Sequence, residues 1–122
     1  MMRARRIAAT LAALVALTGA SDPDNPTCPK EPGWGPDAVM TLTPAARGGK
    51  RVLLAEGVID ASLPDRLRAA IEADEDIEEI WLRSRGGDAS AGNEAGRVIR
   101  SYPGMLTRIP RGWACFSACN FV

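Results

Sequence analysis

Strand-like and helix-like segments alternate along this chain, and the alternation constrains its fold more than any other feature. Short apolar runs at 51–56, 80–82 and 105–109 have the length and composition of strands. Between them, 62–74 and 91–102 carry apolar residues at helical spacing. Strands separated by helices pair in parallel through right-handed crossovers. The chain is therefore predicted to be an α/β domain built around a mainly parallel sheet.

Two further strands are expected at the ends of this pattern. Residues 38–43 form a partly β-branched apolar run, and a turn rich in proline and glycine at 44–50 follows it. Residues 113–115 form the last strand. The run at 80–82 is uniformly apolar, so we place it inside the sheet. By contrast, 74–79 is acidic apart from one isoleucine and is predicted to be a solvated turn rather than a metal site.

The two predicted helices carry start and stop signals. Ser62, with Asp65 three residues later, matches a capping box at the start of the first helix. Pro103 stops the second helix. Gly92 and Gly96 should cost that helix about 1 kcal/mol each relative to alanine, a loss that is explained if its backbone packs closely against the sheet.

The N-terminal segment has the pattern of an export signal. Three arginines within the first six residues precede an apolar run at 7–17, and Thr18-Gly19-Ala20 provides a small-residue cleavage site. The run is about half as long as a bilayer span requires. An uncleaved anchor or a plain N-terminal helix is the alternative. We expect residues 1–20 to be a signal peptide and the protein to be periplasmic or secreted.

A linker is predicted between the signal and the domain. Residues 21–36 contain five prolines and almost no apolar periodicity. Within it, Cys28 and Trp34 are interpreted as parts of a tether that packs onto the domain. The domain itself is expected to occupy 37–122.

Composition excludes several classes of protein. With 122 residues, 46% hydrophobic and 25% charged, the chain fits one small globular domain rather than a disordered or collagen-like protein. The net charge is zero, and no basic patch occurs beyond the first six residues, so no nucleic acid partner is expected. No membrane partner is expected after signal cleavage. The sequence contains no histidine, the commonest general base and metal ligand. We therefore predict no metal and no cofactor.

The C-terminal stretch 113–122 contains the residue most suited to nucleophilic chemistry. Ser117 stands between two cysteines, where a strand turns into a helix, and such a turn can present a nucleophile. Gly86 and Gly87 follow another strand, and ligands gather at the carboxyl ends of parallel strands. Their amides, with that of Ala118, can stabilise an oxyanion. Plain packing of a small residue at Ser117 and an ordinary tight turn at the glycines remain alternatives to this acyl-transfer site.

Three cysteines leave the disulfide pattern open. An oxidising compartment favours one disulfide among Cys28, Cys115 and Cys119, but the sequence does not select the pair. Zinc binding by three cysteines without histidine is not expected at this spacing. A cysteine nucleophile would lack a base, as Ser117 does.

These segments resemble the Clp-protease and crotonase superfamily, in particular its exported Clp-protease-like bacterial members. The matching stretches lie within 50–122: Gly57–Asp60, Ile80–Asp88, Ala91-Gly92 and Cys115–Cys119. The resemblance implies a crotonase-like fold of ββα-type repeats, incomplete at the C-terminus. It also implies that Ser117 is the nucleophile and that amides of Gly87, beside Gly86, and of Ala118 form the oxyanion hole. The implied substrate is a peptide or protein, and homo-oligomers are compatible with it.

The chain departs from this family after Ser117. The family takes a histidine and then an aspartate from segments that follow the nucleophile, whereas this sequence ends five residues later. Its only lysines, Lys30 and Lys50, match no family position. We therefore expect a fragment, a truncated reading frame or a degenerate relative that is inactive as written. Without the next helix, an apolar patch should be exposed.

Three functions are compatible with these observations. The first is a serine endopeptidase-like protein that lacks its base. The second is a non-catalytic peptide-binding or scaffold module that uses the same amide pocket. The third is acyl-CoA chemistry of the crotonase type, against which export argues because coenzyme A is cytosolic.

Overall fold

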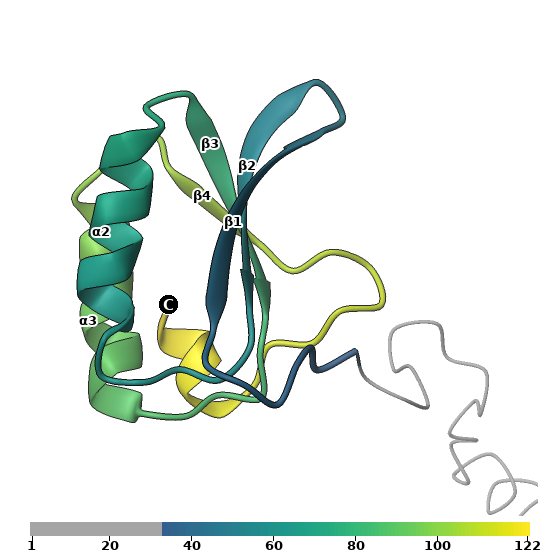
Figure 1. Ribbon diagram of the computed structural model, residues 1–122, viewed down its shortest axis with the longest axis vertical. Coiled ribbons are helices and arrows are strands. Elements are labelled where there is room, and N and C mark those ends of the chain that lie inside the picture. Colours follow the sequence, from purple (N-terminus) through teal and green to yellow (C-terminus); the bar gives the residue numbers. More distant parts are fainter. Residues whose placement is uncertain (1–32) are drawn as a thin grey trace, which may run out of the picture.

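The structure, a computed structural model, describes residues 33–122 and forms a mixed sheet with helices packed on one side (Figure 1). The strands follow the order β1-β2-β3-β4 across the sheet. The first pair is antiparallel and the other two pairs are parallel. The predicted α/β class is thereby confirmed. The elements are β1 (Thr41–Arg47), β2 (Lys50–Glu56), α2 (Leu63–Ala73), β3 (Ile77–Arg83), α3 (Ala89–Arg100), β4 (Leu106–Arg108) and the short 3-10 helix η1 (Ser117–Phe121).

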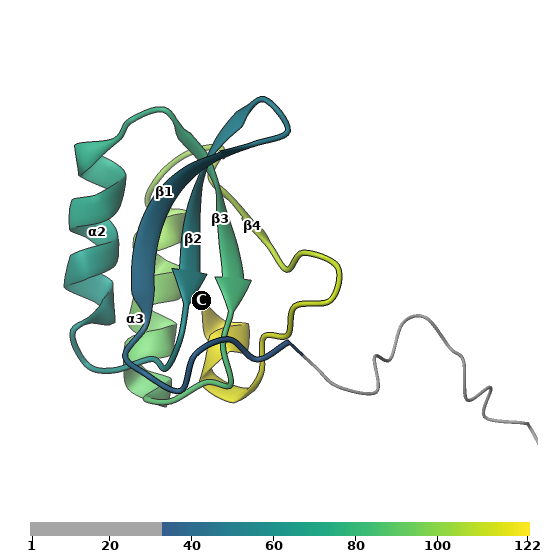
Figure 2. The ribbon, with the colours of Figure 1, turned by 45° about the vertical axis from the view of Figure 1, so that its right-hand side comes forward.

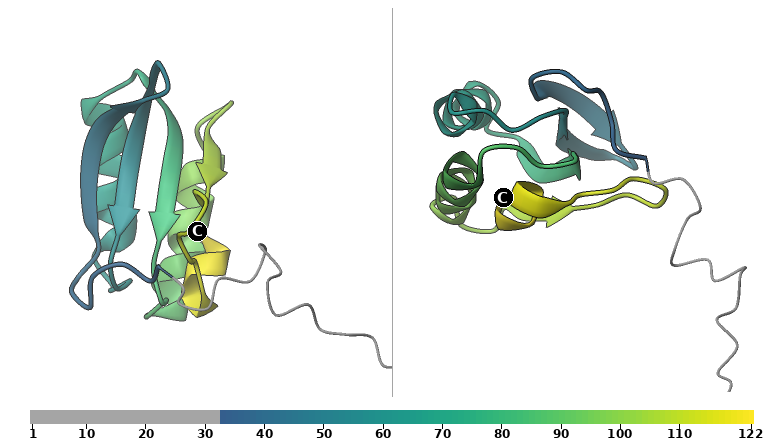
Figure 3. Two further views of the ribbon diagram at one scale, coloured as in Figure 1. Left: turned by 90° about the vertical axis from the view of Figure 1, so that its right-hand side faces the viewer. Right: turned by 90° about the horizontal axis from the view of Figure 1, so that it is seen from below.

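Both helices connect neighbouring parallel strands, and both cover the same face of the sheet (Figure 3). Helix α2 joins β2 to β3, and α3 joins β3 to β4. The main core lies between this face and the helices. It contains Leu53 and Ile80 from the sheet, Leu67 from α2, and Ala95 and Val98 from α3, all 2% exposed or less.

Strand β1 continues through the residues that we predicted to form a turn. It includes Pro44 and ends at Arg47, and the turn itself is only Gly48-Gly49, both with positive φ. A proline is tolerated here because β1 is an edge strand, where a missing amide need not remove a ladder hydrogen bond. The pairing with β2 thus extends further than the composition indicates.

The prediction of a solvated turn at 74–79 is wrong for its second half. Strand β3 begins at Ile77, and Glu79 within it is only 1% exposed. The Glu79 carboxylate accepts hydrogen bonds from Lys50 Nζ at 2.7 Å, Arg108 Nε at 2.7 Å and Trp81 Nε1 at 2.8 Å. These bonds, led by that from Arg108, lower the pKa of Glu79 well below its usual range. Partners far away in sequence therefore allow a carboxylate to be buried here.

Helix α2 starts where expected, but without the predicted capping box. The Ser62 side chain makes no capping bond to the helix. Its Oγ instead donates to Asp60 Oδ1 at 2.7 Å, a bond that lowers the pKa of Asp60. Helix α3 is capped by Asp88, whose Oδ1 accepts from the amide of Ala91 at 2.9 Å.

The predicted strand at 113–115 is reduced to two isolated bridges, Gly33 with Trp113 and Ser84 with Cys115. The Gly33 bridge brings the end of the predicted linker onto the domain. Next to it, the ring of Trp34 packs edge-on against Phe116, with centroids 5.3 Å apart. This contact agrees with the interpretation of Trp34 as part of a tether. The predicted signal peptide, Cys28 and most of the linker lie outside the described residues.

Several large apolar side chains are exposed on and after β4. Leu106, Ile109, Phe116 and Phe121 are between 47% and 61% exposed. The sequence led us to expect exposed apolar surface, without giving its location. Among residues 33–122, no helix is long and apolar enough to cross a membrane.

Candidate functional site

Ser117 occupies a strained turn between an extended segment and η1. Phe116 before it is extended, with φ −133° and ψ 159°, whereas Ser117 has φ 51°. It is the only non-glycine residue between 33 and 122 with positive φ. For an L-residue this conformation costs roughly 1–2 kcal/mol. Its exposed side chain stands at a sharp strand-to-helix turn, the geometry that presents a serine nucleophile in other α/β proteins.

Gly86 packs directly against this turn. A methyl group added to Gly86 would lie 2.8 Å from Cβ of Ser117 and 3.0 Å from the amide nitrogen of Ala118. Gly86 also has φ 108°, which side chains disfavour. Figure 2 shows the strands β2 and β3 pointing toward η1, at the carboxyl end of the sheet. The structure thus brings Ser117, Ala118 and Gly86 together at the rim where the sequence predicted a site.

The glycine segment is held from both sides by backbone hydrogen bonds. On one side, the amide of Ile59 donates to Gly86 O and the amide of Asp88 donates to Ile59 O, both at 2.9 Å. On the other side, the amide of Ser84 donates to Ala114 O at 2.9 Å, and that of Phe116 donates to Ser84 O at 3.0 Å. The segment carrying Ser117 is therefore in fixed register with the glycines.

Ser84 organises the turn that contains the glycines, a role that our sequence analysis missed. It is 0% exposed, and its Oγ accepts a hydrogen bond from the amide of Gly86 at 3.0 Å. A serine two residues before a glycine is a known turn signal, because its hydroxyl can bond the backbone two positions on. That signal was present in the sequence.

Two amides at this rim are free. Within residues 33–122, the amides of Gly87 and Ala118 have no backbone or side-chain hydrogen-bond acceptor. The bridge to Ile59 uses Gly86 O and the amide of Asp88, so the intervening amide of Gly87 points away from Ile59. Free amides of this kind can stabilise a negatively charged oxygen.

A disulfide closes the turn around Ser117. The structure pairs Cys115 with Cys119, with their Cα atoms 5.3 Å apart. Cys119 is 1% exposed and belongs to the core. The sequence had left the pairing open among three cysteines, and the third, Cys28, lies in the part that the structure does not describe.

The glycines of α3 approach η1, not the sheet as predicted. A methyl group on Gly92 would clash with the carbonyl oxygen of Ala118, and one on Gly96 with that of Phe121. The sequence predicted close packing of α3 but did not identify η1 as the element that packs against it. The two are separated by a strand and a long loop, so no local pattern connects them. The two glycines therefore allow η1, which begins at Ser117, to pack closely against α3.

Among residues 33–122, no side chain is hydrogen-bonded to Ser117 as a general base would be. Across 33–122, the Ser117 hydroxyl has no hydrogen-bond partner, and the whole sequence contains no histidine. The described residues also include no cluster of three potential metal ligands. A cavity of about 230 Å³ is lined in part by Asp88, and another of about 240 Å³ is lined in part by the disulfide. Ser117 lines neither of them. Neither of these two cavities therefore provides a pocket at the Ser117 hydroxyl.

Comparison of the chain with protein families, with curated proteins and with solved structures finds no match.

Proposed function

We propose that residues 37–122 form the N-terminal part of a crotonase-like domain related to exported Clp-protease-like serine peptidases. The observation that carries the proposal is the contact between the strained Ser117 turn and Gly86. If Ser117 were only a small packing residue, neither its positive φ nor the exposure of its hydroxyl would be required. These features support the role of nucleophile.

In the proposed chemistry, Ser117 Oγ attacks a peptide carbonyl carbon while the amides of Gly87 and Ala118 receive the developing oxyanion. Expulsion of the amine then leaves an acyl group on Ser117, and water releases it. The hydroxyl proton has to pass through a base to the departing amine. The 122 residues contain no histidine for this transfer, so we propose that the chain is inactive as written.

The proposed location is the periplasm or the exterior, after removal of residues 1–20. The disulfide between Cys115 and Cys119 supports an oxidising compartment. The pattern of arginines followed by an apolar run supports export through a signal peptide.

A second candidate is a module that binds peptides without cleaving them. The absence of histidine from the sequence, together with the two free amides, favours it. In this function the amides of Gly87 and Ala118 hold a peptide carbonyl oxygen in its ground state.

Chemical rescue tests the first proposal. Imidazole in solution replaces the missing base, and p-nitrophenyl acetate supplies an activated acyl group. We expect imidazole to accelerate acetylation of Ser117, detected by mass spectrometry, and labelling by a fluorophosphonate probe. Ser117→Ala should abolish both signals, and Ser90→Ala, an exposed serine at the start of α3, should preserve them.

Equal rates for the wild-type protein and Ser117→Ala would overturn the peptidase relationship. Binding of a peptide without any acylation in the presence of imidazole would favour the second candidate.

A further inference from the structure

A larger cavity lies at the end of the sheet opposite Ser117. It has a volume of about 490 Å³ and is bordered by the C-terminal turn of α2, the loop after α3 and the first residues of β3 and β4. Strand β3 has seven residues, so it separates the two ends by roughly 20 Å. The volume is within the range of about 300–1,000 Å³ that is usual for ligand pockets.

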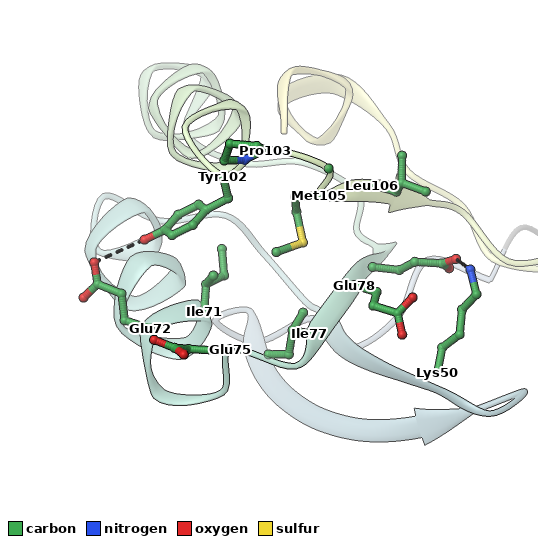
Figure 4. A pocket seen from close by; sticks show the side chains of 12 residues that line it. Lys50, Ile71, Glu72, Glu75, Ile77, Glu78, Tyr102, Pro103, Met105 and Leu106 are labelled. Carbon is green, nitrogen blue, oxygen red and sulfur yellow. Dashed lines mark hydrogen bonds and ion pairs between the residues drawn. The ribbon is translucent and has the colours of Figure 1, made fainter.

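The walls of this cavity are largely apolar. Figure 4 shows the side chains of Ile71, Ile77 and Met105 turned toward a common centre, with the ring of Tyr102 beside them. Leu106 also lines the cavity and is 54% exposed. An apolar side chain entering the cavity would bury this surface, at roughly 25 cal/mol per Å².

The rim of the cavity is acidic. Four glutamates line it together with a single cation, Lys50, which leaves a formal charge of −3. The lysine is already paired with Glu79 at 2.7 Å, which leaves the charges of Glu72, Glu75 and Glu78, with Arg68 near Tyr102 as a further cation. Of these glutamates, Glu72 accepts a hydrogen bond from the Tyr102 hydroxyl at 3.2 Å. Burial of Tyr102 raises the pKa of its hydroxyl, and this hydrogen bond raises it further.

The position of these carboxylates is unfavourable for α2 itself. The last turn of the helix contains no basic residue, and Glu72 and Glu75 lie at its C-terminal end beside Asp74, which is already paired with Arg51 at 2.6 Å. Negative charge there repels the negative end of the helix dipole, typically at 0.3–1 kcal/mol per charge near the surface. Departures from local stability rules are expected where a sequence serves a function. A bound cation would remove the repulsion.

We propose that this cavity binds a peptide segment in which arginine or lysine flanks a large apolar side chain. The apolar residue enters between Ile77 and Met105, and its basic neighbours pair with Glu75 and Glu78 at the rim. Charge complementarity selects this occupant over an acidic peptide or an anionic membrane surface. The site is separate from Ser117, so it stands or fails independently of the proposed peptidase relationship.

Fluorescence anisotropy with synthetic hexapeptides tests the proposal. The probe alternates arginine with leucine, and the two controls replace either the arginines by glutamates or the leucines by glycines. We expect only the arginine–leucine peptide to bind, and to bind more weakly at high salt because the rim is exposed.

Matched variants locate the binding. Replacing both Glu75 and Glu78 by glutamine should weaken binding about 3- to 10-fold, as expected for two exposed ion pairs. Leu106→Asn should also weaken it. Glu94→Gln removes a carboxylate of α3 outside the cavity and should have no effect. Each replaced side chain is exposed, so folding should be retained.

Three results would overturn the proposal. Equal weakening by Glu94→Gln would show general attraction to an acidic protein. Equal binding of the arginine–glycine peptide would show that the apolar walls are unused. Equal binding of the glutamate–leucine peptide would show that the rim carboxylates do not select the ligand.

Discussion

The two ends of the sheet are built in different ways. At the carboxyl end, the candidate site consists of backbone atoms of Gly86, Gly87 and Ala118 beside Ser117. At the opposite end, the cavity is formed by side chains, with apolar walls and a rim of glutamates. The close packing at the carboxyl end consequently requires a residue without a Cβ atom at Gly86. The cavity at the opposite end is determined by the side chains that line it.

This difference determines how each end should respond to substitution. A backbone site fails when a single Cβ is added, because the carbonyl and amide groups around it are held in hydrogen-bonded register. A site made of exposed side chains loses its contacts one at a time. Predictions that separate the two ends follow from this contrast.

The largest effect is expected for Gly86→Ala. The added methyl group would lie 2.8 Å from Cβ of Ser117, on a residue with φ 108°. Overpacking and backbone strain together should lower the free energy of unfolding by about 2–4 kcal/mol. Urea denaturation, followed by circular dichroism, measures this loss.

Gly104→Ala is the matched control, because Gly104 also has a positive φ, of 82°, but nothing lies within 4 Å of the added methyl group. It should cost only the conformational strain of about 1 kcal/mol. Equal losses in the two variants would show that close packing against Ser117 does not contribute.

An intermediate, pH-dependent effect is expected for Glu79→Gln, which removes the charge beside the opposite end of the sheet. The folded protein lowers the pKa of Glu79 below its ordinary value of 4.5, so the ionised carboxylate stabilises the folded state above that pH. This contribution is lost as the pH falls through the lower pKa of the folded state. The variant should therefore be less stable than the wild-type protein at neutral pH, and the difference should narrow in acid.

Denaturation midpoints over a pH series provide the measurement. A difference that stays constant from neutral to strongly acidic pH would contradict the assignment of the effect to the Glu79 charge. Lys50 and Arg108 remain half-exposed and can be hydrated when the carboxylate is removed, which limits the size of the loss.

The smallest effect is expected for Ser117→Gly. Glycine adopts φ 51° without the steric cost of a Cβ, although it loses more entropy on folding. The net result should be a gain of about 0.5–1 kcal/mol, whereas Ser117→Ala should change stability little. A stabilising glycine at a position that uses serine would indicate that the serine is retained for its hydroxyl. A destabilising glycine would show that the turn is not strained.

Much of the carboxyl end was predictable because its signals are local. The strand before Gly86 and the serine between two cysteines are each recognisable within a few residues, whereas the cap at Asp88 was not predicted. Gly86-Gly87 and Ser117 were expected at one rim from the parallel connections alone, and the structure places Gly86 against Ser117. The partner of Cys115, the role of Ser84 and the contact of Gly92 with Ala118 were not identified.

The opposite end was largely missed. The acidic stretch at 74–79 was interpreted as a solvated turn, yet Glu79 is buried and Glu75 and Glu78 line a cavity. The residues that surround this acidic stretch come from β2, from β4 and from the loop before β4. No local sequence pattern connects them with the stretch.

The order of residues by itself determined the alternation of strands and helices, because hydrophobic periodicity and turn residues act over a few neighbours. It also placed the glycine pair at the end of a strand. Only the tertiary structure decided where β3 begins, which cysteines pair and which side chains surround the cavity. Those outcomes depend on contacts between residues far apart in the chain, and such contacts exist only once the strands have taken their places in the sheet.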